Sequence, residues 1–577
     1  MTTDQYRKAE TPLPAEYLAW ELYGAGMENF GRAGQPVSLP LPRPGPEELL
    51  ARVDALGLCY SDVKIINQGE NHPRLTGRNL AAQPVVVGHE VSVTLVAVGE
   101  ALRDRYQVGQ RFIVQPDVYA NGERYSFGYA LRGGAAQYTI IGPEIHSAES
   151  GSYLIPIAKE STGYSEAALT EPWACVERSY HIRSRPGPRS RGLMWIIGLS
   201  GADLGNYYLG EGFDEHGTPR RVMLTEVVGP IISAIRRYSA QYGFSYEETA
   251  ALARLLPLLQ ERRSHLFDDI ILLGLPRAGL VERLSSLLVK GGHLAFICPE
   301  TVEHREDFDL GQIHYDSPQY IGAASWVLMD AYQGRRSSAL AEAGAAWFIG
   351  AGGPVGQMHL QRALEREHAP RVILVTDQNE ARLQMLQERF SKQAEARGSR
   401  FYALRPEAVT RRFVYEITDR EGFSHIVLLA PVAKLAEVAW QCLADRGLLN
   451  VFAGFARGSK ARLRISPIFT RGCRIVGSSG SGIEDLRYVL AETEVGHLAT
   501  DRIVAAVGGI SALRDGITAT AEGKFPGRVV IYPQLDFPLT AIGELRGCAP
   551  AVAEKLEEGR GWNRGAEAAL LAYFLAK

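Results

Sequence analysis

The stretch WFIGAGGPVG at residues 347–356 decides the fold of its region, because an apolar run meets four closely spaced glycines there. Such glycines permit a tight strand-to-helix turn and let backbone N–H groups approach a phosphate closely. A second apolar run, RVILVT at 371–376, ends at Asp377, twenty-one residues after Gly356. A carboxylate at that place accepts the hydroxyls of an adenosine ribose. The stretch therefore predicts a strand, a helix and a strand that bind a dinucleotide.

The predicted cofactor-binding residues are Gly350, Gly352, Gly353, Pro354, Val355, Gly356 and Asp377. No arginine directly follows Asp377 in DQNEA to hold a 2′-phosphate, so the sequence favours NAD over NADP.

A degenerate version of this pattern precedes it by about 150 residues, as WIIGLSGADLG at 195–205 and RVMLTE at 221–226. Later segments also correspond, since FDDIILLGLP at 267–276 resembles FSHIVLLAP at 423–431. We therefore expect a tandem duplication. In the earlier copy Ser200 replaces the middle glycine, and Asp203 places a negative charge where a pyrophosphate would lie, which opposes phosphate binding. Glu226 could still hold a ribose, so both a scaffold and a nucleotide-binding role stay open.

Composition sets mild bounds on the remaining function classes. The chain has 577 residues, 46% of them hydrophobic, which suffices for three or four domains. Its net charge of −3 favours neither nucleic acid nor an anionic membrane as a partner. The lack of a long apolar stretch or signal-peptide core predicts a cytoplasmic protein. Six widely spaced cysteines without a CxxC pair argue against a disulfide scaffold or a four-cysteine zinc site.

The distribution of apolar runs, glycines and prolines along the chain predicts an α/β fold with a β-rich N-terminal part. Short β-patterned runs rich in glycine and proline fill the first 180 residues, as in a small β barrel. From about 190 to 460, apolar strands alternate with helical stretches, which predicts two doubly wound parallel sheets of the Rossmann type. The expected domains are a catalytic domain (1–185), a degenerate Rossmann-like domain (186–335), an NAD-binding Rossmann domain (336–475), a return segment (476–533) and a helical tail (534–577).

Candidate metal ligands lie in the N-terminal part. Cys59 occurs in GLCYSD, His89 and Glu90 occur in GHE, and Glu171 occurs in EPWACVE. A thiolate, an imidazole and a carboxylate suit Zn²⁺, and three protein ligands leave one position open for a substrate.

In this order, these motifs resemble the medium-chain dehydrogenase/reductase superfamily, in its zinc-dependent polyol and sugar dehydrogenase branch. Further similar segments are HPRLTGRNL before GHE, GGAAQY, and EGKFPGRVVIYP near the C-terminus. HPRLTGRNL is most similar to sorbose-1-phosphate reductase-like members. The resemblance implies a GroES-like catalytic barrel in the N-terminal part.

The resemblance also assigns roles to the candidate residues. It implies that Cys59 and His89 ligate zinc, that Glu90 is a ligand or an exchanging neighbour, and that Glu171 binds the metal directly or through its water. Cys175 competes for the third ligand position. Ser61 occupies the proton-relay position of the family, and Asp62 is expected to orient a ligand. The catalytic residues are thus Ser61, Glu90 and Glu171. The cysteines of the family's structural zinc lobe are absent from residues 115–138, so one catalytic zinc is expected.

The predicted function is hydride transfer between NAD and a secondary alcohol of a polyol, sugar or sugar phosphate. Two alternatives are an epimerase or lyase that uses transient NAD oxidation, and a non-catalytic nucleotide-binding sensor or assembly protein. Subunits of the family commonly join the edges of their cofactor-domain sheets. We therefore expect a homo-oligomer, or an internal pseudo-dimer in which the two tandem units pair edge to edge.

Overall fold

The computed structural model describes residues 2–75, 77–149, 151–213, 217–249, 251–261, 266–300, 303–334, 337–365 and 368–576. The chain divides into two compact units. Unit 1 comprises Met1–Glu177 and Gly480–Lys577, and unit 2 comprises Arg178–Ser479. The C-terminal segment therefore folds with the N-terminal region, although some 300 residues separate them in the sequence.

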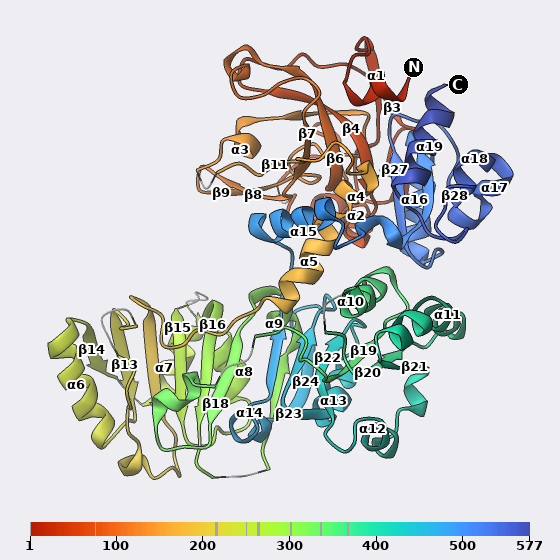
Figure 1. Cartoon of the computed structure of the whole chain (residues 1–577). Coiled ribbons are helices and arrows are strands. Elements are labelled where there is room, and N and C mark those ends of the chain that lie inside the picture. Colours follow the sequence, from red (N-terminus) through yellow and green to blue (C-terminus); the bar gives the residue numbers. More distant parts are fainter. Residues whose placement is uncertain are drawn as a thin grey trace. The chain divides into compact units, whose positions relative to one another are not determined.

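Unit 1 contains a mostly antiparallel eight-stranded sheet with the order β11-β7-β6-β4-β27-β26-β28, in which β10 also pairs with β4 (Figure 1). Its strands are β4 (Leu49–Gly57), β6 (Glu90–Val98), β7 (Arg111–Val114), β10 (Tyr138–Ile141), β11 (Leu154–Pro156), β26 (Val504–Gly509), β27 (Arg528–Tyr532) and β28 (Thr540–Ala541). Strand β4 pairs with β6, β27 and β10, and it is buried along its whole length because it lies inside this sheet. Closure of the sheet into a barrel stays a prediction.

The helices of unit 1 include α2 (Tyr60–Gln68), α4 (Tyr164–Ala168), α15 (Ile483–Val495), α16 (Leu513–Glu522) and α19 (Arg564–Leu575). Helix α19 is tied to the body of the unit by Glu567, whose buried carboxylate accepts hydrogen bonds from the backbone of Tyr164 and from the hydroxyl of Tyr532. The helical tail thus packs on unit 1.

Unit 2 contains two six-stranded parallel sheets, so the expected alternation of strands and helices is confirmed (Figure 1). The first sheet has the order β14-β13-β12-β15-β16-β18, and the second has the order β21-β20-β19-β22-β23-β25. In chain order both arrangements are 3-2-1-4-5-6, which is the order of a dinucleotide-binding fold.

The first sheet consists of β12 (Leu193–Gly198), β13 (Arg221–Thr225), β14 (Ser245–Glu248), β15 (Phe267–Leu273), β16 (Leu288–Ile297) and β18 (Gln319–Ala323). Its helices are α6 (Pro230–Tyr242), α7 (Leu252–Glu261), α8 (Leu280–Ser285) and α9 (Leu310–Asp316).

The second sheet consists of β19 (Ala345–Ile349), β20 (Val372–Thr376), β21 (Arg400–Leu404), β22 (Phe423–Leu428), β23 (Leu443–Val451) and β25 (Arg474–Gly477). Its helices are α10 (Pro354–Glu365), α11 (Glu380–Ala396), α12 (Arg411–Ile417), α13 (Ala433–Gln441) and α14 (Ser466–Thr470).

The two sheets differ at their first crossover. A long helix, α10, connects β19 to β20, whereas the described residues between β12 and β13, 199–213 and 217–220, hold only the 3₁₀ turn η4 (Leu204–Asn206). Tyr207, Leu209 and Phe213 from that connection pack with Leu328 and Met329 against the face of the first sheet. An irregular segment therefore covers the sheet where the second sheet has a helix.

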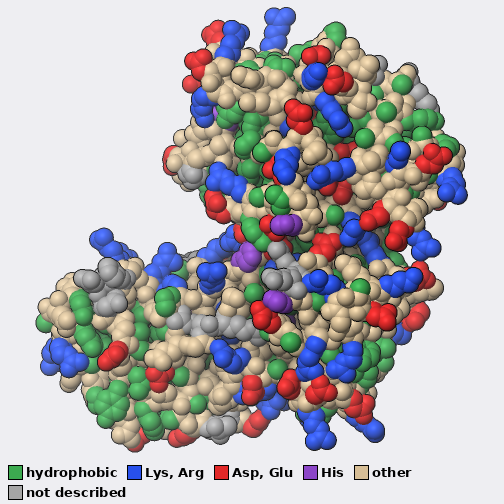
Figure 2. All heavy atoms as spheres, in the orientation of Figure 1, with side chains coloured by type: hydrophobic (Ala, Val, Ile, Leu, Met, Phe, Trp, Pro, Cys, Tyr) green, Lys and Arg blue, Asp and Glu red, His purple; other side chains and the backbone are tan. Residues whose placement is uncertain are grey.

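None of the helices in the described ranges is both long and apolar enough to cross a membrane. On the face that Figure 2 shows, basic and acidic side chains are interspersed, in keeping with the small net charge.

Candidate metal centre and nucleotide site

Three of the predicted ligands come together in unit 1. Cys59 follows β4 and caps α2, while His89 and Glu90 stand at the start of β6. The antiparallel register of these strands sets Gly57 opposite Glu90, which brings the two motifs side by side. One ligand atom from each of Cys59, His89 and Glu90 lies within 4.8 Å of the others. One strand pairing thus brings together two motifs that lie thirty residues apart in the sequence.

Asp62 and Ser61 hold the imidazole of His89 from its two nitrogens. Nδ1 of His89 lies 3.3 Å from Oδ1 of Asp62, and Nε2 lies 3.4 Å from Oγ of Ser61. The other carboxylate oxygen of Asp62 accepts the N–H of Cys59 at 2.9 Å. Although burial opposes charging of His89, the Asp62 carboxylate and Tyr129 raise its pKa well above the ordinary value. Asp62 therefore lies where it can orient an imidazole ligand, as the sequence predicted.

Glu90 supplies the structural test of whether this cluster fits a cation. Its side chain is fully buried, and Arg528 on β27 forms an ion pair with Oε2. Its other oxygen, Oε1, is buried and has no hydrogen-bond partner within the part of the chain that the structure describes. A buried carboxylate oxygen without a partner is costly, and a metal ion bound with Cys59 and His89 would satisfy it. The donor set of sulfur, nitrogen and oxygen fits Zn²⁺.

Glu171 and Cys175 lie beside each other in α5 (Thr170–Tyr180). The Cys175 thiol is placed to donate to Oε1 of Glu171, at 3.5 Å. Burial, together with the charge of Glu90, raises the pKa of Glu171 to about 7 despite the opposing charge of His89. Burial also raises the pKa of the Cys175 thiol well above its usual value. Glu171 is not one of the three residues with close ligand atoms, so its role as a ligand stays a prediction.

Two residues of this site were not singled out by sequence reasoning. Tyr129 is buried, its ring centroid lies 5.9 Å from that of His89, and its hydroxyl interacts with Ser61. Arg528 pairs with Glu90 across the sheet. The segment FPGRVVIYP carried part of the family resemblance and includes Arg528, so a weak signal existed for that residue. Tyr129 stands in a loop without a motif, and no spacing could identify it.

The predicted nucleotide turn lies between β19 and α10 in unit 2. Gly350 has a φ of 80°, and a Cβ on Gly352 would lie 2.6 Å from a carboxylate oxygen of Asp377. A Cβ on Gly356 would collide with the backbone of Ala351, so glycine lets α10 pack closely on the turn. A Cβ on Gly353, just before Pro354 and Val355 of α10, would face open space. The helix N-terminus thus fits an incoming phosphate.

Asp377 lies directly after β20 and shapes the same turn. Its Oδ2 accepts the N–H of Gly352 at 2.9 Å, and its Oδ1 accepts the N–H of Asn379 at 3.0 Å. Each carboxylate oxygen can accept more than one hydrogen bond, so the group can still receive ribose hydroxyls.

The corresponding turn of the first sheet is built differently. The hydroxyl of Ser200 accepts from the guanidinium of Arg277 at 2.9 Å, and Oδ2 of Asp203 accepts from the side chain of Asn206 at 2.6 Å. Glu226, the counterpart of Asp377, is exposed and has a φ of 55°. No described α-helix starts at this turn, so its backbone N–H groups are not gathered as at α10.

Comparison with known proteins supports the chemistry of unit 1. Residues 45–148 match the family model "Alcohol dehydrogenase GroES-like domain". The chain is 28% identical to L-sorbose 1-phosphate reductase of Klebsiella pneumoniae over 301 residues, which is 49% of this chain and 71% of that protein. It is 24% identical to mannitol-1-phosphate 5-dehydrogenase of Aliivibrio fischeri over 327 residues, covering 54% of this chain and 76% of that protein.

Among solved structures, 2R,3R-butanediol dehydrogenase from Bacillus subtilis aligns with a TM-score of 0.50 at 14% identity, covering 90% of this chain and 99% of that chain. The matched domain contains Cys59, His89 and Glu90, and the fold is shared. Residues 45–148 therefore carry an alcohol dehydrogenase GroES-like domain, and the chain is similar to the zinc-type alcohol and polyol dehydrogenases of the medium-chain dehydrogenase/reductase superfamily.

Proposed function

We propose that the protein is a zinc- and NAD-dependent oxidoreductase that transfers a hydride between a secondary alcohol of a polyol, sugar or sugar phosphate and the nicotinamide. The observation that carries this proposal is the cluster of the partly buried Cys59 with the buried His89 and Glu90, in which one carboxylate oxygen of Glu90 has no hydrogen-bond partner among the described residues. The names of the two sugar-phosphate relatives support the substrate class.

The cluster residues would hold the zinc, with Glu90 as a ligand or an exchanging neighbour. Glu171 would complete the set directly or through water, in preference to Cys175, whose thiol is held protonated by burial. When bound, zinc supplies Lewis acidity that lowers the pKa of a substrate hydroxyl. We propose this single zinc and no structural zinc, since residues 115–138 lack cysteine.

The protein's own groups move the proton and fix the geometry. The hydroxyl of Ser61, next to Nε2 of His89, is placed to take the proton of the substrate hydroxyl and pass it on. Tyr129 contacts Ser61 and shields the imidazole, and Asp62 keeps that ring in one orientation. NAD, bound at the turn before α10, supplies the hydride acceptor. Asp377 favours NAD over NADP because its carboxylate repels a 2′-phosphate.

The first sheet is proposed to be a degenerate second copy that acts as an internal partner. Strand β17 (Arg305–Asp309) follows the first sheet's β16, and it pairs antiparallel with β24 (Lys460–Arg464), which follows the second sheet's β23, in a separate two-stranded sheet. Edge residues at equivalent positions also meet, because Nη2 of Arg474 donates to Oε1 of Gln319 at 3.0 Å. The N–H of Ala324 donates to the carbonyl of Phe469 at 2.9 Å.

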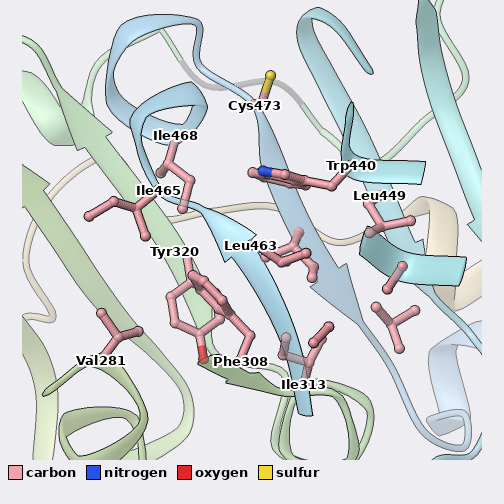
Figure 3. Close-up of a cluster of buried hydrophobic side chains, with 14 of the residues drawn as sticks. Val281, Phe308, Ile313, Tyr320, Trp440, Leu449, Leu463, Ile465, Ile468 and Cys473 are labelled. Atoms are coloured by element: carbon pink, nitrogen blue, oxygen red, sulfur yellow. The ribbon is translucent and has the colours of Figure 1, made fainter. Parts of the chain in front are cut away.

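Both sheets also share one hydrophobic core (Figure 3). Phe308, Ile313 and Tyr320 of the first copy lie in it with Leu463 and Ile468 of the second. An edge that commonly joins two subunits is thus joined within one chain, which supports an internal pseudo-dimer over a homo-oligomer formed through this edge.

Metal content and NADH formation test the proposed activity. Purified full-length protein is expected to contain one zinc per chain and to form NADH with members of a panel of polyols and sugar phosphates. Cys59→Ser should lose the metal and at least 100-fold of the rate, while Cys548→Ser, at an exposed cysteine, should change neither. A fully active Cys59→Ser variant without zinc would refute the zinc mechanism. Product formation without net NADH would instead indicate an epimerase or a lyase.

Hydrogen exchange tests the internal pseudo-dimer. The amides of β18 and β25 are expected to show the same protection at 0.1 and 10 μM protein, since their contacts lie within one chain. Protection that rises with concentration would assign this edge to an interface between copies.

A further inference from the structure

A guanidinium and an imidazole lie against the ring of Tyr129, the tyrosine next to His89 of the metal cluster. The guanidinium of Arg74 lies over the Tyr129 ring, 4.6 Å from its centroid, and the imidazole of His72 lies 5.4 Å away in a tilted stack. The same tyrosine contacts His89 and Ser61. One ring thus connects the proposed proton relay to a guanidinium and an imidazole.

The charges in this group do not balance. Asp117 forms ion pairs with both Arg74, at 3.1 Å, and Arg124, at 3.0 Å, through the same oxygen. Lys64 is exposed and adds its charge close enough to His72 to lower the pKa of that imidazole, together with burial and Arg74. Asp117 is therefore shared by two arginines and Lys64 adds a third positive charge, while Asp62, the other carboxylate that acts on Tyr129, is paired with His89.

The group is also accessible and has free hydrogen-bonding capacity. The Arg74 side chain is 31% exposed, although it is stacked on a tyrosine that is almost completely buried. Nδ1 of His72 accepts the N–H of Arg74, so in the neutral ring Nε2 carries the proton and is a donor. A planar guanidinium held by stacking and a nearby N–H donor match the oxygens of a phosphate.

We propose that Arg74, His72 and the face of Tyr129 form a subsite for the phosphate of a sugar or polyol phosphate, so that phosphorylated substrates are preferred over neutral polyols. This inference rests on the proposed function, because it places the alcohol of the same molecule at the metal cluster. The phosphate dianion offsets the excess positive charge that Asp117 leaves. Arg74 thereby acts as a specificity residue, and Tyr129 connects the subsite to Ser61.

The kinetic test compares sorbitol with a hexitol 1-phosphate, using NADH formation by the zinc-loaded full-length enzyme. The wild type is expected to favour the phosphate by at least about tenfold in kcat/KM. Arg74→Ala should raise the KM for the hexitol phosphate by about 10- to 100-fold and change sorbitol oxidation less than twofold. Arg103→Ala, at an exposed arginine elsewhere in unit 1, should leave both substrates unaffected.

Asp117→Asn is expected to change the KM for the hexitol phosphate in the opposite direction to Arg74→Ala. Removing this carboxylate frees Arg74 and Arg124 from their shared partner, so the KM for the hexitol phosphate should fall by about two- to fivefold. A structural role for the ion pairs would instead raise it. Equal losses for both substrates in Arg74→Ala, or a wild type that does not distinguish them, would overturn the subsite.

Inorganic phosphate gives a readout that does not depend on turnover. Titration calorimetry should detect phosphate binding to the wild type, weakened at least tenfold in Arg74→Ala and unchanged in Arg103→Ala. Equal phosphate affinity in all three proteins would overturn the subsite. If neither alcohol is oxidised, the proposed function fails, and the calorimetric result still decides whether the phosphate site exists.

Discussion

The first and second sheets of unit 2 have similar interiors and differ at one turn. In the first, the indole N–H of Trp195 donates to Thr225, and Phe267 lies against the ring at 5.0 Å. In the second, the indole of Trp347 donates to Thr376, and Phe423 lies at 5.5 Å. Both sheets also have a register shift near the start of their fourth strand in chain order. It lies between Phe267 and Asp269 in the first sheet and between Phe423 and His425 in the second.

The turns that follow the first strand of each sheet share none of this similarity. One leads into α10 and gathers its glycines around Asp377, while the other leads into η4 and an irregular segment. The two sheets thus share packing contacts and differ at the turn where we propose that the cofactor binds. The comparison teaches that the same sheet interior forms with either connection, so the proposed cofactor binding depends on a single crossover.

The largest expected difference between the sheets concerns the last glycine of each turn. Gly356→Ala places a Cβ against the backbone of Ala351, so the KM for NAD should rise by about 100-fold, with a loss of about 1–3 kcal/mol in unfolding free energy. Replacing glycine by alanine inside a helix normally stabilises the protein, so a loss of unfolding free energy here would indicate the steric clash with Ala351. Gly205→Ala meets only an ordinary contact with Asp203 and should change neither quantity. Steady-state kinetics and urea unfolding measure both.

The acidic residues after the second strands give the next largest contrast. Asp377→Ala should raise the KM for NAD by about 10- to 100-fold, because two charge-assisted hydrogen bonds to the ribose are lost. Glu226→Ala, at the exposed counterpart, should leave it unchanged. The reverse pattern would show that the first sheet binds the cofactor.

The sequence anticipated the parts of this comparison that depend on local pattern. Apolar runs such as Val372–Val375 lie within the observed strands, and the fingerprint around Gly350 forms the turn that its glycines require. The loss of the first crossover helix was not foreseen, because GADLG still contains residues that a helix tolerates. Its replacement depends on Leu328 and Met329, more than 100 residues away, which fill the space over the sheet.

The candidate metal cluster also combines residues that a local sequence pattern predicts with residues that only distant contacts bring into place. Cys59, His89 and Glu90 were found from motifs, since each lies beside a strand end whose register a local pattern sets. Arg528 and Tyr129 reach the cluster from a distant strand and a loop, through contacts that only the folded chain defines.

Matched glycines at the sheet edges test whether the two copies contribute equally to their junction. A Cβ on Gly477 would lie 2.6 Å from the carbonyl oxygen of Ile313. One on Gly322 would lie 2.8 Å from Cβ of Phe469 across the junction and 2.6 Å from the carbonyl oxygen of Phe296 in its own sheet. Alanine at either position should cost about 1–3 kcal/mol in urea unfolding. Gly547→Ala, where a Cβ meets open space, is the control. A loss confined to one edge glycine would break the proposed symmetry.

The smallest expected contrast lies in the buried polar groups of the second sheet. Nδ1 of His359 in α10 lies within hydrogen-bonding distance of the Tyr180 hydroxyl, at 2.6 Å, and burial with the charge of Arg362 lowers the pKa of His359 to about 3. An ordinary histidine has a pKa of 6.5, so acid protonates the unfolded chain before the folded one.

Stability from this neutral histidine is therefore fully present above pH 6.5 and is lost as the pH falls from 6.5 toward 3. At pH 5 the loss amounts to about 2 kcal/mol. His359→Gln removes the titrating group, so the difference in unfolding free energy between pH 7.5 and pH 5 should shrink by that amount. Urea unfolding of both proteins at the two pH values measures it, and an unchanged difference would place the acid sensitivity elsewhere. His497→Gln, at an exposed histidine, is the matched control.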